Sequence, residues 1–355
     1  MKTVLAVTVG LAASGISAQA EEINVMSWGG AVAAAQMEAY HKPYMAETGI
    51  KINSIDADNP AVPIKAQVEV GNVTVDIADV EPSDLVRLCD EGLLEQLPID
   101  ELPDGSDGTK AADDFIEGGL YDCGVGILVY STVIGYRGDQ LEGVTSASDF
   151  FDLEKFPGKR GLRKGAKFSL ELALMADGVE PADVYTVLAT PEGVDRAFAK
   201  LDTIKNDTVW WEAGAQPVQL LADGEVVMTT AYNGRLFDAA INENKPFEIL
   251  WDNQILDFNL YVIPKGAPNK DAAWTYIKWA TQSERQADLT RYISYGPVRM
   301  SGSAGVGLYK DNKTEMATYL PTYPDYLDDA LTSDVEFWAN YDTELSERFN
   351  TWLAN

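Results

Sequence analysis

Histidine and cysteine are scarce in this chain, and their scarcity limits the chemistry open to it. The 355 residues include one histidine, His41, and two cysteines, Cys89 and Cys123. A single histidine argues against His-based catalytic triads and excludes zinc sites built from several histidines. The GxSxG, HExxH, P-loop and CxxC patterns are also missing. We therefore expect no cofactor and no metal site, while the missing motifs alone leave other types of enzyme open.

Long apolar runs are missing after the first twenty residues, so we expect no membrane-spanning helix there. The start of the chain is different. Met1-Lys2 precedes an uncharged apolar stretch over 4–13, and Ala18-Gln19-Ala20 is a small-x-small pattern. This order is typical of a cleaved signal peptide over residues 1–20, and it predicts a periplasmic protein. A buried N-terminal helix is the alternative. The absence of a cysteine at the cut argues against a lipid anchor.

Basic residues are few beside the acidic ones. The chain has 27 Lys and Arg against 56 Asp and Glu, which gives a formal net charge of −29. Such a surface repels nucleic acid and anionic membranes, so we expect neither as a partner. Solubility or adaptation to a salty medium explains the charge without reference to a ligand. The bulk charge therefore does not indicate what the protein binds.

The two cysteines, Cys89 and Cys123, predict a disulfide if the chain enters an oxidising compartment. That bond would close a loop of about 35 residues and stabilise the fold by roughly 3–4 kcal/mol. Two separate buried thiols are the alternative.

Strand and helix patterns alternate along the first ninety or so residues. The expected strands cover 23–26, 50–52 and 73–80, and the expected helices cover 31–47, 62–70 and 82–91. This rhythm predicts an α/β fold with a largely parallel sheet. Two long extended runs, near 125–136 and 257–264, are candidate hinges between two lobes, because no low-complexity linker separates the halves. Ordinary core strands are the alternative for both runs.

Several motifs follow one another in a characteristic order. They are SWGG (27–30), ETGIK (47–51), VDIADVEPSDL (75–85), FPGKRGLRKG (156–165), LADGEVVMTTAYNGR (221–235), LYVIPKGAPNKDAAWTYIKWA (260–280) and YGPV (295–298). With these motifs the chain resembles the extracellular solute-binding proteins of ABC importers, in the spermidine/putrescine-binding branch.

The resemblance implies a type II-like periplasmic binding fold, with two α/β lobes joined by crossover hinge strands and a ligand in the cleft. It also implies a binding protein that is not an enzyme, with permease subunits in the membrane as partners, and a monomer. We predict that residues 21–130 plus 260–300 form lobe 1, and that residues 131–259 plus 301–355 form lobe 2.

An amine ligand loses water when it binds, and aromatic faces and carboxylates can replace that water. Trp28 follows a strand and precedes a helix start, so we expect it to form a wall of the cleft. The N–H groups of Gly29 and its neighbour can receive a ligand carboxylate. Glu81 follows a strand end that faces the crevice of an α/β sheet, where it can bind an ammonium. A helix-start acid that favours the dipole is the alternative for Glu81.

The pair Trp210-Trp211 is followed by an acid, Glu212. Neighbouring side chains of an extended segment point to opposite faces, so at most one tryptophan lines the cleft. We predict that Trp211 and Glu212 do so, and structural packing is the alternative. The resemblance places a turn that faces the cleft at Tyr232-Asn233, with Tyr232 stacking on the ligand and Asn233 bonding to it.

Arg235 binds a ligand carboxylate in bidentate fashion, or it pairs with the nearby Asp238. In the family that the chain resembles, an aspartate stands in the second crossover segment, at the position that Asn259 occupies here. Asp257 lies two positions earlier, and we expect it to supply that carboxylate. Tyr295, in a turn near the hinge, either touches the ligand or only packs.

Basic residues stand where polyamine binders present acids, namely Arg163, Lys164 and Lys167. A second ammonium would meet like charge there. Two ligand classes therefore stay open. The resemblance favours a polyamine-type amine such as putrescine or spermidine. The basic cluster favours a zwitterionic amine or onium compound, such as γ-aminobutyrate, betaine or dimethylsulfoniopropionate.

Two other roles are weaker. A sensor that presents its ligand to a receptor would share the same cleft. Relatives that capture ferric iron use adjacent tyrosines, and this chain has no Tyr-Tyr pair.

Overall fold

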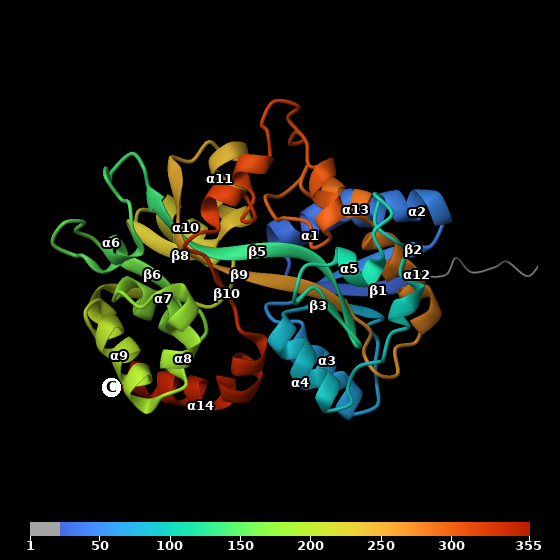
Figure 1. Cartoon of the computed structure of the whole chain (residues 1–355), viewed down its shortest axis with the longest axis horizontal. Coiled ribbons are helices and arrows are strands. Elements are labelled where there is room, and N and C mark those ends of the chain that lie inside the picture. The colour runs from blue at the N-terminus through green and yellow to red at the C-terminus, as the bar shows by residue number, and fades with distance from the viewer. Residues whose placement is uncertain (1–21) are drawn as a thin grey trace, which may run out of the picture.

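Ten strands form one mixed sheet that runs through the whole molecule in the computed structural model, which describes residues 22–355 (Figure 1). The strand order is β2-β1-β3-β9-β5-β8-β6-β7, with β10 beside β9 and β4 beside β5. The strands are β1 (Glu22–Ser27), β2 (Lys51–Asp56), β3 (Ile77–Val80), β4 (Leu120–Tyr121), β5 (Gly124–Arg137), β6 (Arg160–Arg163), β7 (Thr208–Trp211), β8 (Met228–Tyr232), β9 (Phe247–Val262) and β10 (Leu331–Thr332). The predicted signal peptide lies outside the described residues.

Helices cover the two ends of this sheet. They are α1 (Gly30–Gln36), α2 (Lys42–Thr48), α3 (Ala61–Glu69), α4 (Pro82–Asp90), α5 (Ala111–Asp114), α6 (Ala147–Phe151), α7 (Ser169–Ala176), α8 (Val184–Leu188), α9 (Pro191–Asp202), α10 (Gln216–Ala222), α11 (Asn233–Asn242), α12 (Lys270–Ala280), α13 (Ser283–Leu289) and α14 (Val335–Ala354). A π-helical turn, η1 (Met37–His41), joins α1 to α2. The remaining single turns are η2 (Ile99–Glu101), η3 (Pro181–Asp183), η4 (Lys205–Asp207), η5 (Met300–Gly305), η6 (Ala317–Tyr319) and η7 (Pro324–Tyr326). Within residues 22–355, no helix is long and apolar enough to cross a membrane.

The expectation of a largely parallel sheet holds only for the outer strands. β1, β2 and β3 are parallel in one half of the molecule, and β6, β7 and β8 are parallel in the other. The two central strands, β5 and β9, are antiparallel to each other and long enough to belong to both halves. The chain crosses between the halves once in each direction through these strands, which makes them antiparallel.

The third predicted strand is shorter than the sequence suggested. Residues 77–80 form β3, but residues 73–76 form no strand. The Asp76 carboxylate accepts hydrogen bonds from the backbone N–H groups of Asn24 and Asn269, at 2.8 Å in each case. The Asp76 carboxylate thus binds a backbone N–H group that would be available for sheet pairing if β3 began earlier.

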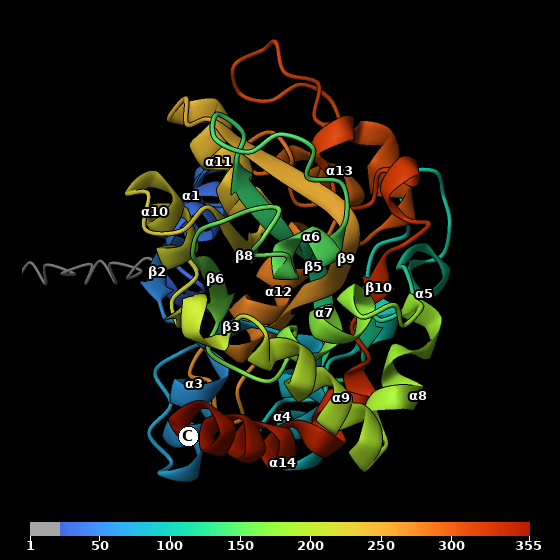
Figure 2. The ribbon, with the colours of Figure 1, turned by 90° about the vertical axis from the view of Figure 1, so that its left-hand side faces the viewer.

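Each half has its own apolar core. One cluster of buried side chains comes from residues 23–130 and 256–298, and the other comes mainly from residues 134–204 and 331–349. The arrangement is two α/β lobes joined by β5 and β9 (Figures 1 and 2). The last helix, α14, belongs to the second core but packs beside α4 of the first lobe.

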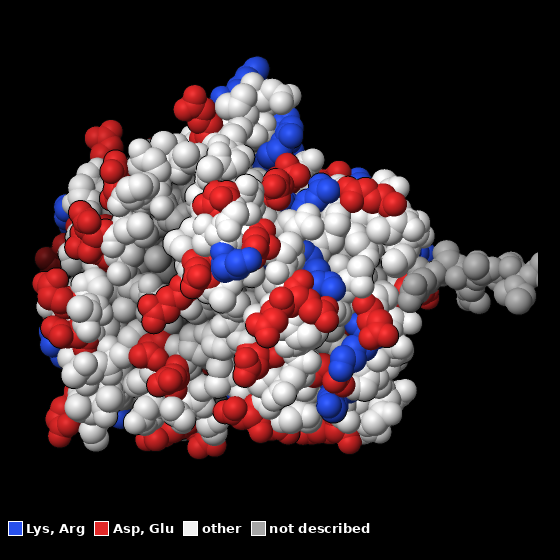
Figure 3. Space-filling view, turned by 45° about the vertical axis from the view of Figure 1, so that its right-hand side comes forward, with Lys and Arg blue, Asp and Glu red and all other residues white. Residues whose placement is uncertain are grey.

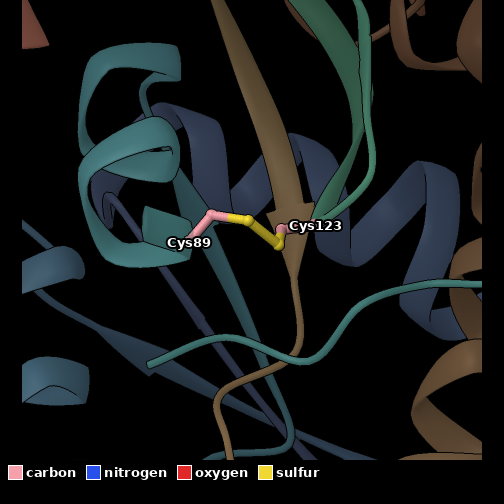
Figure 4. The surroundings of a disulfide bond; sticks show 2 residues. All are labelled: Cys89 and Cys123. Atoms are coloured by element: carbon pink, nitrogen blue, oxygen red, sulfur yellow. A yellow bond between two sulfur atoms is a disulfide. The ribbon is translucent and has the colours of Figure 1, made fainter. Parts of the chain in front are cut away.

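The predicted disulfide is present between Cys89 and Cys123, whose Cα atoms are 6.1 Å apart (Figure 4). Cys89 lies near the end of α4, and Cys123 lies in the turn between β4 and β5. The bond therefore ties α4 to the start of a crossover strand.

The surface carries the acidic excess in separate groups. On the face in Figure 3, acidic side chains outnumber basic ones, and basic side chains lie between several of the acidic groups. The negative charge on this face is therefore not one continuous patch.

Candidate binding cleft

A cavity lies between the two lobes and contains about 490 Å³ of space not filled by atoms, part of it open to solvent. The residues that line it are Trp28, Val32, Asp58, Glu81, Tyr130, Arg163, Glu212, Gly214, Tyr232, Arg235, Asn259 and Tyr295.

Most of this lining follows the carboxyl ends of parallel strands. In the first lobe, Trp28, Asp58 and Glu81 come just after β1, β2 and β3. In the second lobe, Arg163 ends β6 and Glu212 follows β7. Ligands of open α/β sheets bind at this edge of the strands, and here two such edges face each other. The crossover strands add Tyr130 and Asn259.

The structure brings six of the predicted contacts together around the cavity: Trp28, Glu81, Glu212, Tyr232, Arg235 and Tyr295. It places the other four, Gly29, Trp211, Asn233 and Asp257, behind the lining.

The aromatic lining is a connected group of rings. Tyr130 lies edge-on to Tyr232, with ring centroids 5.4 Å apart, and tilted against Tyr295 at 6.1 Å. Trp211 packs edge-on behind Tyr232 at 5.9 Å and is 2% exposed. Trp211 therefore supports the cavity wall rather than forming it.

Asn233 joins the two lobes instead of facing the cavity. Its amide oxygen accepts the backbone N–H of Ser131 at 3.0 Å, and its amide nitrogen donates to the backbone oxygen of Ser294 at 2.5 Å. The side chain is fully buried. These bonds use both ends of the amide, so Asn233 has a structural role at the position where a ligand contact was expected.

A buried ion cluster closes one end of the cavity. Lys167 donates from Nζ to Glu81 Oε2 at 2.8 Å and to Asp257 Oδ2 at 2.7 Å. Tyr130 donates to the other oxygen of Glu81 at 3.0 Å, and Arg163 lies 3.8 Å from it. The two acids that were expected to bind an amine are thus already paired with a lysine of this chain.

The carboxyl groups of this cluster differ in acidity. Burial would raise the pKa of Glu81, but the charges of Lys167 and Arg163 outweigh burial and lower it to about 2. For Asp257, burial outweighs the attraction of Lys167, and the nearby Glu81 charge adds to the effect, so its pKa is raised. Glu81 is therefore the stronger acid of the pair.

Arg235 is a buried cation without an acidic partner among residues 22–355. Its side chain donates from Nη2 to the backbone oxygens of Trp28 at 3.3 Å and Gly29 at 3.4 Å, and its Nε has no hydrogen-bond partner. The residue is 8% exposed. The alternative pairing with Asp238 does not form, because Asp238 accepts a hydrogen bond from Asn242 instead.

Glycine at the start of α1 makes room for this guanidinium. A Cβ atom on Gly30 would lie 2.6 Å from Arg235 Nη1, and both Gly29 and Gly30 have positive φ angles, 66° and 58°. Gly29 was predicted to offer its N–H to a ligand. In the structure its carbonyl accepts a bond from Arg235 across the cleft, and the predicted role of its N–H stays a prediction.

Asn259 is oriented by a buried carboxylate. Its amide nitrogen donates to Asp79 Oδ1 at 2.6 Å, and Asp79 Oδ2 accepts from Ser27 and Gln36. Burial raises the pKa of Asp79 to about 7, against the opposing effect of these hydrogen bonds. With its nitrogen held by Asp79, Asn259 has its amide oxygen left to accept a bond from the cleft.

The rim of the cavity is more polar and more exposed. Glu212 pairs with Lys164 at 2.7 Å, and both side chains are largely exposed, at 68% and 41%. An ion pair in this setting contributes little to stability. Glu212 therefore lines the opening rather than the buried part of the cleft.

Sequence reasoning did not propose Asp58, Tyr130 or Arg163 as contacts. Asp58 and Arg163 obey the same strand-end rule that identified Glu81, so applying it to every strand would have found them. Tyr130 required knowing that β5 crosses between the lobes. Among residues 22–355, no group of three or more His, Cys, Asp or Glu side chains is placed to hold a metal ion.

Comparison with known proteins gives a consistent match over most of the chain. Residues 39–318 match the family described as bacterial extracellular solute-binding protein. A γ-aminobutyric acid-binding protein of Pseudomonas aeruginosa is 43% identical over 343 residues, which cover 96% of this chain and 94% of the relative.

Two solved structures of relatives are also similar. The PBP MotA from A. tumefaciens B6 in complex with glucopine is 31% identical, with a TM-score of 0.84 over 94% of this chain and 99% of that one. The structure named Atu4243-GABA receptor is 34% identical, with a TM-score of 0.79 over 94% of this chain and 98% of that one. These two relatives have similar identities but are named with different ligands, so the ligand of this chain must be argued from its own cleft.

The two-lobed periplasmic binding fold is confirmed, and the predicted branch is corrected. The spermidine/putrescine ABC transporter substrate-binding protein PotD of Streptococcus pneumoniae is 17% identical, with a TM-score of 0.69 over 94% of this chain and 99% of that one. At that identity only the fold is shared. The relatives named for γ-aminobutyrate are more similar than this polyamine-binding one.

Proposed function

We propose that this chain, which belongs to the bacterial extracellular solute-binding proteins, captures a small zwitterionic amine of the γ-aminobutyrate type between its lobes. Members of this family bind solutes and are not enzymes. The relatives named for γ-aminobutyrate support the zwitterionic ligand over the polyamine that the sequence placed first.

The guanidinium of Arg235, which has no acidic partner among residues 22–355 and leaves Nε without a hydrogen bond there, carries this proposal. A buried donor without a partner costs about 1–3 kcal/mol, and a ligand carboxylate would remove that cost. Arg235 lies in the first turn of α11, where the backbone N–H groups also favour negative charge. Arg163, which lies 3.8 Å from Glu81 in the ion cluster, lines the same cavity and adds positive charge to it. The part of the cleft around Arg235 therefore suits an anion.

The ammonium end of the ligand has different partners. Trp28 and Tyr232 offer ring faces to a cation, at about 0.5–2 kcal/mol each. Asn259 offers an amide oxygen, and Asp58 lines the opening. A ligand with one ammonium and one carboxylate is matched by these groups.

We propose further that the protein is exported to the periplasm as a monomer and delivers its ligand to the permease subunits of an ABC importer. The family description supports an extracellular location, and the pattern of residues 1–20 supports export. The shared fold with an ABC-transporter binding protein supports the permease as partner.

A thermal-shift and calorimetry panel tests the ligand class. The compounds are γ-aminobutyrate, glycine betaine, dimethylsulfoniopropionate, putrescine and spermidine. A ligand at 100 times its Kd stabilises the protein by about 2.7 kcal/mol. We expect γ-aminobutyrate to give the largest shift. A shift with putrescine or spermidine alone would overturn the proposal, and so would no shift with any compound.

A further inference from the structure

Lys167 occupies a position between two carboxylates that an ammonium of a ligand would otherwise take. We propose that Lys167 is an internal counter-ion that determines specificity: it fills the second ammonium position and restricts the cleft to ligands with one ammonium. This inference rests on the proposed function, since it concerns the same cleft. It assigns a selective role to a residue that does not line the cavity.

The geometry of Lys167 is that of a bound ammonium. Its Nζ lies 2.8 Å from Glu81 Oε2 and 2.7 Å from Asp257 Oδ2, with Ser83 Oγ at 3.5 Å. The side chains of Lys167, Glu81 and Asp257 are 12%, 9% and 1% exposed. These are the partners that a primary ammonium of a diamine needs, and they come from different parts of the chain.

The backbone around Lys167 supports a dedicated position. Phe168, the next residue, has a φ angle of 71°, which is uncommon for a bulky side chain. Lys167 Nζ also lies 4.9 Å from the centre of the Phe168 ring. The local chain thus adopts a costly conformation at the point where it delivers the ammonium to the two acids.

A second cavity adjoins the first behind this lysine. Glu81 and Arg163 line both cavities, whereas Lys167, Ser83 and Asp84 line only the second. Removing the lysine side chain would take away the cation that now binds both Glu81 and Asp257.

The charge balance explains the expected selectivity. With Lys167 in place, the acids at this end are satisfied, and Arg163 and Arg235 repel a second positive group. Without Lys167, a diamine brings back the missing cation, whereas a ligand carboxylate meets two acids. Specificity here comes from a repulsive element as much as from an attractive one.

The test is to measure putrescine and γ-aminobutyrate affinities by calorimetry for the wild type and for Lys167→Ala. A hydrogen-bonded ammonium–carboxylate contact corresponds to about 10- to 100-fold in affinity. We expect Lys167→Ala to bind putrescine tighter than the wild type by that factor and to bind γ-aminobutyrate more weakly.

The matched control is Lys164→Ala, which removes the same side chain three residues away. Lys164 pairs with Glu212 on the exposed rim. We expect its putrescine affinity to change by less than about fivefold. An equal gain in both variants would mean that net charge, not the position of Lys167, controls selectivity, and the proposal would be wrong.

A second variant covers the case in which Lys167→Ala does not fold, because it leaves two buried acids. Lys167→Ala with Asp257→Asn removes one charge of each sign and keeps Glu81 as the acceptor. Circular dichroism and thermal melting establish which variants are folded. A folded variant that gains no putrescine affinity overturns the proposal.

The wild-type data separate this inference from the proposed function. If the wild type does not bind γ-aminobutyrate but Lys167→Ala gains putrescine, the ligand assignment fails and the role of Lys167 stands. If the wild type binds γ-aminobutyrate and no folded Lys167 variant gains putrescine, the role of Lys167 fails and the ligand assignment stands.

Discussion

Two buried cations at the cleft, Lys167 and Arg235, have opposite surroundings. Lys167 binds two carboxylates within 2.8 Å. Among residues 22–355, Arg235 donates only to backbone oxygens, at 3.3 and 3.4 Å, and its Nε has no hydrogen-bond partner. Both residues are poorly exposed, so solvent does not compensate for the difference. The comparison indicates that the charge of Lys167 is paired with carboxylates without a ligand, whereas the charge of Arg235 is not paired.

This difference separates structural from ligand-binding charges. Breaking a complete buried ion pair costs about 3–5 kcal/mol, because one charge is left without its partner. A buried cation without an acidic partner favours ligand binding, because an anion that binds there satisfies a donor that is already buried. Sequence reasoning that looks only for charged residues cannot distinguish the two cases.

Removing the unpaired charge of Arg235 should have the largest effect on ligand binding. We expect Arg235→Met to weaken γ-aminobutyrate binding by about 100-fold, because a charged hydrogen bond to the ligand is lost. The unfolding free energy should change little, since no acidic partner is left unpaired. Calorimetry and urea unfolding measure the two quantities.

Arg196→Met is the control for Arg235. Arg196 pairs with Asp177 on the surface, and its side chain is 44% exposed. It should bind γ-aminobutyrate as the wild type does. If Arg235→Met also binds γ-aminobutyrate normally, Arg235 does not bind the ligand carboxylate.

Removing the Glu81 carboxylate from the ion cluster around Lys167 should lower the stability of the fold. The pKa of Glu81 is lowered on folding, to about 2, so its carboxylate stabilises the fold above the unfolded pKa. We expect Glu81→Gln to lower the unfolding free energy by about 2–3 kcal/mol at pH 7. This stabilisation is lost as the pH falls from the unfolded pKa toward 2, so the wild type and the variant should converge at pH 2–3.

Urea unfolding at pH 7 and pH 3 checks this pH dependence. Glu212→Gln provides the control, because Glu212 pairs with Lys164 in an exposed setting. It should change the unfolding free energy by less than about 1 kcal/mol. A difference between Glu81→Gln and the wild type that does not shrink at pH 3 would contradict the assigned role of Glu81.

A smaller effect should follow at Asp79, which positions a ligand contact without touching the cavity. An asparagine there has one acceptor oxygen and brings an N–H₂ group toward donors such as Gln36 and Asn259. We expect Asp79→Asn to weaken γ-aminobutyrate binding by about tenfold through a misoriented Asn259.

Stability should change less than binding in Asp79→Asn. Burial already raises the pKa of Asp79 to about 7, so the fold tolerates an uncharged group at this position. Ser27→Ala removes another donor to Asp79 and leaves Asn259 in place, so its affinity should stay normal. Equal losses in both variants would assign the effect to general disturbance of the cleft.

The strand-end contacts could be predicted from the sequence, and the pairing of their charges could not. Trp28 and Glu81 follow recognisable strands, and the strand-end rule places such residues at the cleft. The partners of Asp257 and Arg235 come from segments far away in the chain, since Lys167 and the Trp28 carbonyl are contacts of the folded state. Local patterns hold no information about them.

The crossover strands show the same limit. The length of β5 was evident from the sequence, whereas β9 was expected only over 257–264 and begins ten residues earlier, at Phe247. The direction of both strands depends on the path of the chain through both lobes. The sequence also predicted that at most one of Trp210 and Trp211 lines the cleft, and that Trp211 is the one that does. In the structure neither does, because Trp210 packs against Phe349 and Trp352, while Trp211 lies behind Tyr232.

The most direct test is a competition between γ-aminobutyrate and putrescine on the wild-type protein by calorimetry. The two compounds share a four-carbon chain, and each has an ammonium at one end. They differ at the other end, where one has a carboxylate and the other a second ammonium. Because Arg235 has no acidic partner and Lys167 is already paired with two carboxylates, γ-aminobutyrate should bind and a hundredfold excess of putrescine should not displace it. Displacement by an equal concentration of putrescine would contradict the account.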